Sequence, residues 1–139
     1  MADPDCLFCG IVAGSIPSER IDENERTVAF MDINPATRGH ALVVPREHAA
    51  DLMEIGEYDL TATMLAAQRL SRRIMDVLDA DGIDLINACG AAAWQTVFHF
   101  HIHIVPRYED DPLELPWVPE AGDPDEIAKV AQRLRGEHD

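Results

Sequence analysis

The sequence predicts an α+β fold in which an antiparallel sheet carries helices on one side. One observation is a long stretch, from Tyr58 to Asp79, whose apolar residues recur with the period of an amphipathic helix. The other is a set of short runs rich in β-branched and aromatic residues, which predict strands. These runs cover residues 18–23, 27–32, 40–45, 84–89 and 98–107. Strands and helices do not alternate in a βαβ rhythm, so a parallel sheet is not expected.

Turn and capping signals separate the predicted elements. Residues 7–13 are mostly apolar and predict one or two helical turns that end at Gly14. Asn24 lies between the first two predicted strands, which indicates a hairpin. A surface loop rich in proline and acidic residues is expected after the last strand. Asp123 followed by Pro124 then predicts a final helix, because aspartate caps helices and proline is favoured at the first helical position.

Length and charge limit what the protein can do. The 139 residues are enough for one domain with a hydrophobic core. The formal net charge of −15 repels nucleic-acid backbones and anionic membranes, so neither is expected as a partner. The sequence has no apolar run as long as a membrane span and no pattern of a secretion signal, so a cytoplasmic location is expected. The three cysteines, an odd number, argue against a disulfide framework.

Three histidines, His99, His101 and His103, alternate with apolar residues. On a strand they would share one face, while the opposite face, towards a core, would carry Phe98, Phe100, Ile102 and Ile104. Residues two apart on a strand are separated by about 6.8 Å and residues four apart by about 13 Å. Two neighbouring histidines can therefore share one small site, such as a metal ion or a phosphate, but all three cannot converge on one ion. A solvated face that happens to contain histidines is the alternative.

Several further segments accompany the histidines. They are Phe8, residues 29–35, Gly39 with His40, residues 95–97 and residues 99–105. Together they resemble the histidine triad (HIT) superfamily of nucleotide hydrolases and transferases. The resemblance covers about residues 5–108 of a single expected domain, 1–139, and the tail and helix at 109–139 lie outside it. It implies a five-stranded antiparallel sheet, a homodimer with one continuous ten-stranded sheet, and a nucleoside monophosphate site beside the histidines.

The resemblance also implies roles for individual polar residues. His101 would be the nucleophile that forms a nucleotidyl-histidine intermediate, since neutral imidazole is a good nucleophile near pH 7. His103 would bind the phosphate and deliver a proton, or would only support the other groups. Gln95 and Thr96 would contact the phosphate and the leaving group, and His40 would support the active site.

The nucleotide site is implied in the same way. Asp32 would accept both ribose hydroxyls, because two carboxylate oxygens match a vicinal diol. Asn87 would add a hydrogen-bond donor. The family usually has glycine where this chain has Trp94, and a large ring at this position would change the shape of the leaving-group side of the pocket. The apolar slot for the base would be formed by Leu7, Phe8, Ile11, Phe30, Ile33 and Leu42, for each of which ordinary core packing is the alternative.

Cys6 and Cys9 form a Cys-x-x-Cys motif, which suggests a metal site or a redox pair. Redox pairs of this type usually follow a strand, and none is predicted here. Many bacterial members of the resembled family bind structural zinc through such a pair, with His48 and His99 as the other implied ligands. Cys2His2 is a closed tetrahedral set of the kind that structural zinc prefers, and it would give His99 a function apart from the other two histidines. Two unligated thiols are the alternative, and Cys89 is expected to be a buried core thiol.

Together these interpretations predict a nucleotide hydrolase or nucleotidyl transferase. It would release a nucleoside monophosphate, AMP or GMP, from a phosphoramidate or a dinucleoside polyphosphate. Structural zinc is the expected cofactor, and a purine nucleotide is the expected ligand. A non-catalytic, nucleotide-binding regulatory dimer is the main alternative, and a zinc-organised interaction scaffold is a third.

Overall fold

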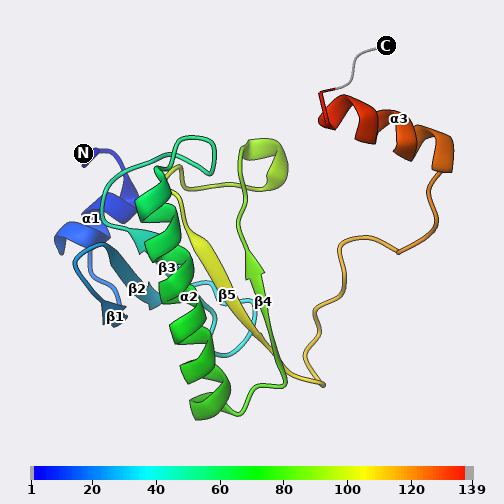
Figure 1. Ribbon diagram of the computed structural model, residues 1–139. Helices are drawn as coiled ribbons and strands as arrows, with labels where there is room; N and C mark the ends of the chain where they lie inside the picture. Colours follow the sequence, from blue (N-terminus) through cyan, green and yellow to red (C-terminus); the bar gives the residue numbers. More distant parts are fainter. Residues whose placement is uncertain (1, 137–139) are drawn as a thin grey trace.

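A five-stranded antiparallel sheet with one long helix lying across it forms the body of the protein (Figure 1). The computed structural model describes residues 2–136. In chain order the elements are α1 (Leu7–Ala13), β1 (Arg20–Glu23), β2 (Thr27–Met31), β3 (Ala41–Pro45), α2 (Glu57–Leu78), β4 (Gly82–Ile86), the short 3-10 turn η1 (Ala91–Ala93), β5 (Ile102–Arg107) and α3 (Pro124–Leu134). The α+β class and the antiparallel sheet predicted from the sequence are confirmed.

The order of the strands across the sheet is β1-β2-β3-β5-β4, and every neighbouring pair is antiparallel. Strand β5, which carries the last of the three histidines, therefore lies between β3 and β4. His103 is opposite Leu42 on β3 and Ile86 on β4. Because ladders on both sides hold this part of β5, the backbone at His103 is fixed.

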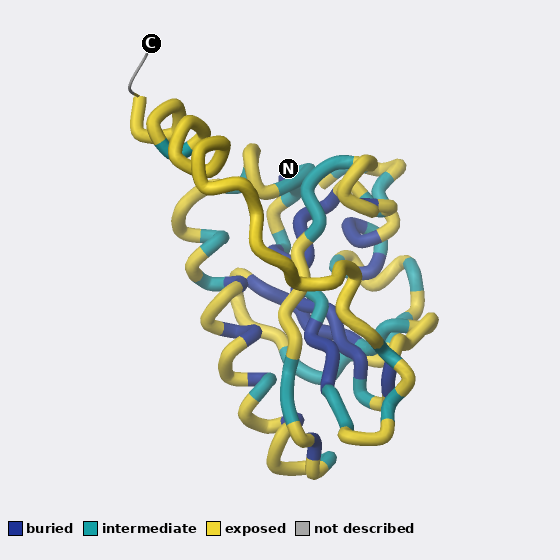
Figure 2. The backbone as a smooth tube through the Cα atoms, turned by 90° about the vertical axis from the view of Figure 1, so that its right-hand side faces the viewer, coloured by how far each residue is buried: buried dark blue, intermediate teal, exposed yellow. Residues whose placement is uncertain are grey.

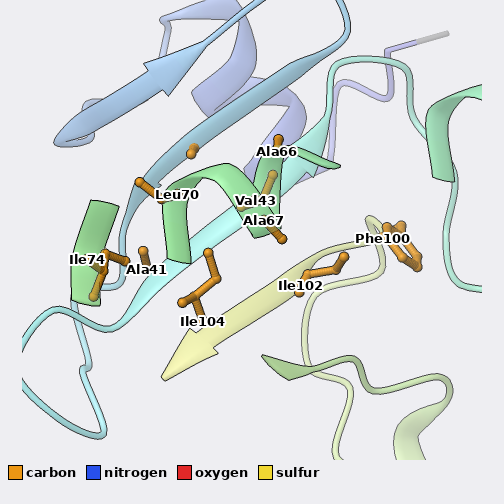
Figure 3. Packing of buried hydrophobic residues seen from close by; sticks show 10 residues of the cluster. Ala41, Val43, Ala66, Ala67, Leu70, Ile74, Phe100, Ile102 and Ile104 are labelled. Carbon is orange, nitrogen blue, oxygen red and sulfur yellow. The ribbon is translucent and has the colours of Figure 1, made fainter. Parts of the chain in front are cut away.

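Helix α2 covers one face of the sheet with small and aliphatic residues. Its residues Ala66, Ala67, Leu70 and Ile74 are buried against side chains from β2, β3 and β5 (Figure 3). The sheet residues are every second one along their strands, as a strand that faces a helix requires. They are Ala29, Ala41, Val43, Ile102 and Ile104.

Helix α1 packs on the opposite face of the sheet, so the expectation of helices on one side holds only for α2. Phe8 and Ile11 of this helix form a second core cluster with the intervening residues of β2 and β3. Those residues are Val28, Phe30, Leu42 and Val44. All five residues of β3 are buried, because both of its faces are covered. A helix of seven residues has too short an apolar repeat to reveal from sequence which face it covers.

Two of the predicted strands have different ends from those expected. Strand β5 begins at Ile102 rather than at residue 98, and β4 ends at Ile86 rather than at residue 89. The chain between them is a loop that contains η1 and the first two histidines. Phe98 is therefore not a core residue as predicted, and its side chain is 48% exposed. Phe100 does enter the core, and its backbone N–H donates to the carbonyl of Ala49 at 2.7 Å.

The C-terminal part of the chain leaves the sheet as an arm. The loop after Arg107 and helix α3 stand apart from the body in Figure 1, and Figure 2 colours most of this arm as exposed. The predicted cap of α3 is confirmed, since the side chain of Asp123 accepts from the backbone N–H of Asp125. None of the eleven residues of α3 is buried. Within residues 2–136, no helix is both long and apolar enough to cross a membrane.

Trp94, which ends η1, has an unusual backbone conformation. Its φ of 77° and ψ of 15° lie in the left-handed region, which large side chains rarely adopt. The indole does not compensate by packing, since the residue is 76% exposed. A conformation of this kind costs a residue other than glycine about 1–3 kcal/mol. The glycine usual at this position in the resembled family would avoid that cost.

We expect the Trp94→Gly variant to be more stable than the wild type by about 1 kcal/mol. Relief of the left-handed strain should outweigh the extra entropy that glycine gives to the unfolded chain. Ala93→Gly is the matched control, because Ala93 has a negative φ and gains only the entropic cost. Urea unfolding followed by circular dichroism would measure both variants. A loss of stability in Trp94→Gly would mean that the indole makes compensating contacts.

Candidate functional site

The three histidines do not share one face of a strand, because His99 and His101 precede β5 and only His103 lies within it. All three are nevertheless sheltered from solvent. His99 is fully buried, His101 is 4% exposed and His103 is partly buried. The rings of His101 and His103 lie edge to face with centroids 4.9 Å apart, whereas His99 turns towards the cysteines of α1. The predicted separation of His99 from the other two is thus present, although a bend in the chain produces it.

The ring of His101 has one nitrogen fixed by the protein. Its Nδ1 lies 2.7 Å from the backbone carbonyl of His99, which can only accept, so Nδ1 carries the proton. The lone pair is therefore on Nε2. Burial lowers the pKa of His101, and the bond to the His99 carbonyl offsets part of that effect. The ring is accordingly neutral near pH 7, which is the form that can act as a nucleophile.

The protonation of His103 follows from a chain of hydrogen bonds that starts in the backbone. The N–H of Ala36 donates to Nδ1 of His40 at 2.9 Å, so the proton of a neutral His40 is on Nε2. That nitrogen lies 3.0 Å from Nδ1 of His103 and donates to it. His103 therefore carries its own proton on Nε2, the nitrogen that remains available to a ligand.

The surroundings of His103 keep it uncharged. Burial and the neighbouring rings of His101 and His40 lower the pKa of His103 to about 4, against a smaller opposing effect of Asp32. The same carboxylate is 3.4 Å from Nε2 of His40, and burial also lowers the pKa of His40. The site thus holds three neutral imidazoles beside one carboxylate.

An apolar cleft of about 330 Å³ opens in front of these histidines. His101, His103, Asp32 and Thr96 supply its polar wall. All six residues predicted to form the base slot line it as well. They are Leu7, Phe8, Ile11, Phe30, Ile33 and Leu42. The cleft has the size and the mostly apolar lining of a small-ligand site.

Two of the predicted site residues, Gln95 and Asn87, form hydrogen bonds with the backbone and do not line the cleft. Gln95 is 4% exposed, and its amide nitrogen donates to the carbonyls of Ala50 and Val97 while its oxygen accepts from the N–H of Gly90. Asn87 donates to the carbonyl of His101 at 2.9 Å. In this structure Gln95 holds the loop before Thr96 in shape, and Asn87 fixes the backbone of the candidate nucleophile.

Cys6, Cys9, His48 and His99 converge at the start of α1. Their four ligand atoms all lie within 4.8 Å of one another. Nδ1 of His99 is 3.3 Å from Sγ of Cys6, 3.4 Å from Sγ of Cys9 and 3.3 Å from Nδ1 of His48. A tetrahedral zinc ion, with Zn–S of about 2.3 Å and Zn–N of about 2.0–2.1 Å, sets its ligands about 3.3–3.8 Å apart. The spacing fits zinc.

The protonation of His99 fits a metal ligand as well. Its Nε2 lies 2.8 Å from the carbonyl of Pro45 and must donate to it, which leaves the lone pair of Nδ1 directed at the cluster. Asp32, His40 and His103 also place ligand atoms within 4.8 Å of one another. There the backbone N–H of Ala36 puts the proton of His40 on the nitrogen that a metal would need. Hydrogen bonding therefore explains the second group.

Sequence reasoning missed the backbone groups that set these protonation states. The carbonyls of Pro45 and His99 and the N–H of Ala36 have no side-chain signature, so no pattern in the chain could have identified them. It also missed part of the cleft wall. Ile16, Pro17, Ser18, Met31, Asn34 and Val97 line the cleft in addition to the predicted residues.

Known proteins with similar sequences and structures show which family the chain belongs to. The HIT domain family model matches residues 13–110. The protein named "Protein hit" from Bacillus subtilis is 35% identical over 133 residues, which cover 94% of this chain and 92% of the relative.

Solved structures give the same result. A zinc-bound histidine triad family protein from Mycobacterium smegmatis is 37% identical, with a TM-score of 0.76 over 96% of this chain and 98% of that protein. A histidine triad nucleotide-binding protein from Candida albicans is 29% identical, with a TM-score of 0.84 over 95% and 96% of the two chains. The chain belongs to the HIT domain family.

Proposed function

We propose that the protein is a nucleotide hydrolase or nucleotidyl transferase that releases a nucleoside monophosphate from a phosphoramidate or a dinucleoside polyphosphate. The observation that carries this proposal is the state of His101. Its Nε2 lone pair faces a ligand-sized cleft while Nδ1 is bound to a carbonyl. A neutral imidazole held in one orientation is suited to attack a phosphorus atom. Membership of the HIT family, whose hydrolases and transferases act on nucleotides, agrees with this role.

The reaction would proceed in two steps. Nε2 of His101 attacks the α-phosphorus, and the bond from phosphorus to the leaving amine or phosphate breaks. Nε2–H of His103 donates a hydrogen bond to the leaving atom, which takes up a proton from water as it departs, so His103 stays neutral. Water then attacks the nucleotidyl-histidine, the N–P bond breaks, His101 regains its Nε2 lone pair, and the proton released by the attacking water goes to the solvent. Transfer to another acceptor in place of water would give the transferase reaction.

The cleft supports a purine nucleotide as the ligand. The apolar walls formed by α1, β2 and β3 would hold the base, and adenine and guanine would fit alike. Asp32 lies in the same cleft, and its Oδ1 is held by the N–H of Asn34 at 2.8 Å. The carboxylate would accept the ribose hydroxyls. Thr96 would donate to the phosphate from the loop that Gln95 braces.

We assign a structural zinc ion to Cys6, Cys9, His48 and His99. The fit of the four ligand atoms and the lone pair of His99 support this assignment, and the zinc-bound relative agrees with it. The ion would fold the start of α1 onto the loop before β5, and no chemical step passes through it. Thiols that bind zinc persist in a reducing compartment, which agrees with the cytoplasm.

Removal of one zinc ligand is expected to remove the metal. Cys9→Ser should reduce the zinc content from one ion per chain to nearly none. It should also lower the unfolding temperature by about 10 °C, which for a chain of this size corresponds to a loss of about 3 kcal/mol. Elemental analysis and thermal unfolding would measure these effects. Cys89→Ser is the matched control, and an equal loss of zinc in the control would contradict the assignment.

We also propose that two copies pair through β4 and α2. Strand β4 is at the edge of the sheet, so the outer side of its backbone is available to a second strand. An apolar groove between β4 and α2 includes Met64, Leu65 and Leu85, which are 45%, 56% and 43% exposed. The buried hydroxyl of Ser71 in the same groove has no hydrogen-bond partner among the described residues. A second copy would cover this groove and extend the sheet to ten strands.

A charge in this groove should separate the two copies. Leu85→Asp is expected to shift the mass from that of a dimer to that of a monomer, because an unpaired carboxylate would be buried in the interface. Sedimentation velocity would give the mass. Met53→Asp is the control, since Met53 is 81% exposed and lies outside the groove. A wild-type protein that sediments as a monomer would refute the pairing.

The test of the proposed function is the release of AMP from adenosine phosphoramidate by the wild type and by His101→Ala. The variant should lose turnover by about 1,000-fold or more, because it lacks the attacking nitrogen. It should keep its fold and its affinity for AMP, measured by circular dichroism and calorimetry. Equal turnover by the two proteins would refute the mechanism.

The regulatory dimer gives a different result in the same assay. AMP would bind to both proteins, and the wild type would turn over neither adenosine phosphoramidate nor dinucleoside polyphosphates.

A further inference from the structure

His99 contacts both the cysteine cluster and the candidate nucleophile. Its side chain reaches Cys6, Cys9 and His48 through Nδ1, and its backbone carbonyl accepts a hydrogen bond from Nδ1–H of His101 at 2.7 Å. We propose that the metal cluster positions the nucleophile, so that loss of the metal lowers catalysis by misplacing His101 without unfolding the protein. This inference rests on the proposed function of His101.

The position of His99 depends on two groups. Its Nε2 donates to the carbonyl of Pro45, and its Nδ1 faces the cluster. A bound metal ion would fix the second nitrogen as firmly as the strand fixes the first. Without the ion, the hydrogen bond to Pro45 and the packing against Phe8 and His48 would remain, but the cluster would no longer fix Nδ1, and the ring could shift. Such a shift would move the carbonyl of the same residue and with it Nδ1 of His101.

Helix α1 provides a second connection between the cluster and the nucleophile. Phe8 lies between the two cysteines in the chain, and its ring meets that of His101 edge to face at 5.0 Å and 87°. The same ring contacts Phe30 at 5.4 Å and His99 at 6.1 Å. Phe8 also lines the cleft, together with Leu7 from the same turn. A shift of this turn would therefore change both the wall of the cleft and the support of the nucleophile.

The two ends of α1 are held differently. At its C-terminal end, the guanidinium of Arg20 donates to the carbonyls of Ile11 and Val12, and Gly14 closes the last turn. At its N-terminal end, Sγ of Cys6 accepts from the N–H of Cys9 at 3.2 Å. A seven-residue helix is not stable by itself, so its first turn depends on these thiols. Loss of the metal would release the end of the helix that carries Phe8.

The expected effect is large in rate and small in fold. A displacement of about 1 Å at a reacting group can cost about 100-fold in rate. None of the four cluster residues lies in a strand or in α2, because two belong to the start of α1 and two to loops. The packing of α2 on the sheet should therefore persist. A merely structural metal would change stability and leave the rate of the folded fraction unchanged. The ratio of these two effects distinguishes the alternatives.

The experiment compares the full-length wild type with zinc, the same protein after treatment with a chelator, and Cys6→Ser. Imidazole ¹⁵N resonances of His101, identified by their absence in His101→Asn, report which nitrogen carries the proton. With zinc, the Nδ1–H form alone is expected. Without zinc, a mixture of both forms is expected, together with a loss of about 100-fold in kcat on adenosine phosphoramidate. Circular dichroism should remain that of a folded protein, and added zinc should restore the chelated wild type. Cys89→Ser is the matched control and should behave as the wild type.

The outcomes separate this inference from the proposed function. If the zinc-loaded wild type cleaves no nucleotide but the His101 resonances respond to zinc, the function fails and the coupling stands. If the chelated protein keeps both its single Nδ1–H form and its kcat, the coupling is wrong while the function stands. If removal of zinc unfolds the chain, the inference is overturned, because the metal then supports the fold as a whole. Zinc-loaded Phe8→Leu should bind zinc and lose about 10-fold in kcat, and an unchanged kcat would also overturn the inference.

Discussion

The hydrogen bond from Nδ1 of His101 to the carbonyl of His99 is the contact on which the site depends. It places the lone pair of His101 on the nitrogen that faces the cleft. The carbonyl can serve in this way because the chain bends before β5, so that His99 turns away from the cleft and towards α1. A regular strand through all three histidines would direct each carbonyl sideways to a neighbouring strand. The departure from regular structure therefore creates the site.

The chain is strongly acidic, yet the site proposed to bind an anion carries little charge. The net charge is −15, whereas the cleft contributes neutral histidines and one carboxylate, Asp32. Burial lowers the pKa of His101 and brings that of His103 to about 4, so neither adds a positive charge near pH 7. Hydrogen-bond donors, such as Nε2–H of His103, would then hold the phosphate. A site without a fixed positive charge binds its product less tightly, which suits release after each turnover.

The sequence was sufficient for side chains that act through their own chemistry. The alternation of histidines, the Cys-x-x-Cys motif and the apolar residues around Phe30 predicted the gathering of donors and the walls of the cleft. The sequence was insufficient wherever a bend in the chain or a backbone group decides where a side chain lies and what it bonds to. Gln95 was expected at the phosphate because of its amide, but its hydrogens are engaged with two carbonyls behind the cleft. Phe98 was expected in the core because a regular strand was extended through it.

The contrast between the two histidine clusters shows how much a single backbone group decides. His99 and His40 are both buried, and His99 has three potential metal ligands beside it whereas His40 has two. The carbonyl of Pro45 accepts a hydrogen bond from Nε2–H of His99, which leaves the lone pair of Nδ1 for a metal. The N–H of Ala36 occupies the lone pair of His40 at Nδ1 and leaves a proton for His103. Exchanging a backbone acceptor for a backbone donor thus changes a candidate metal ligand into a hydrogen-bond donor. A search for metal sites by side-chain type alone cannot separate the two clusters. The hydrogen bonds that the backbone makes to Nε2 of His99 and to Nδ1 of His40 do separate them.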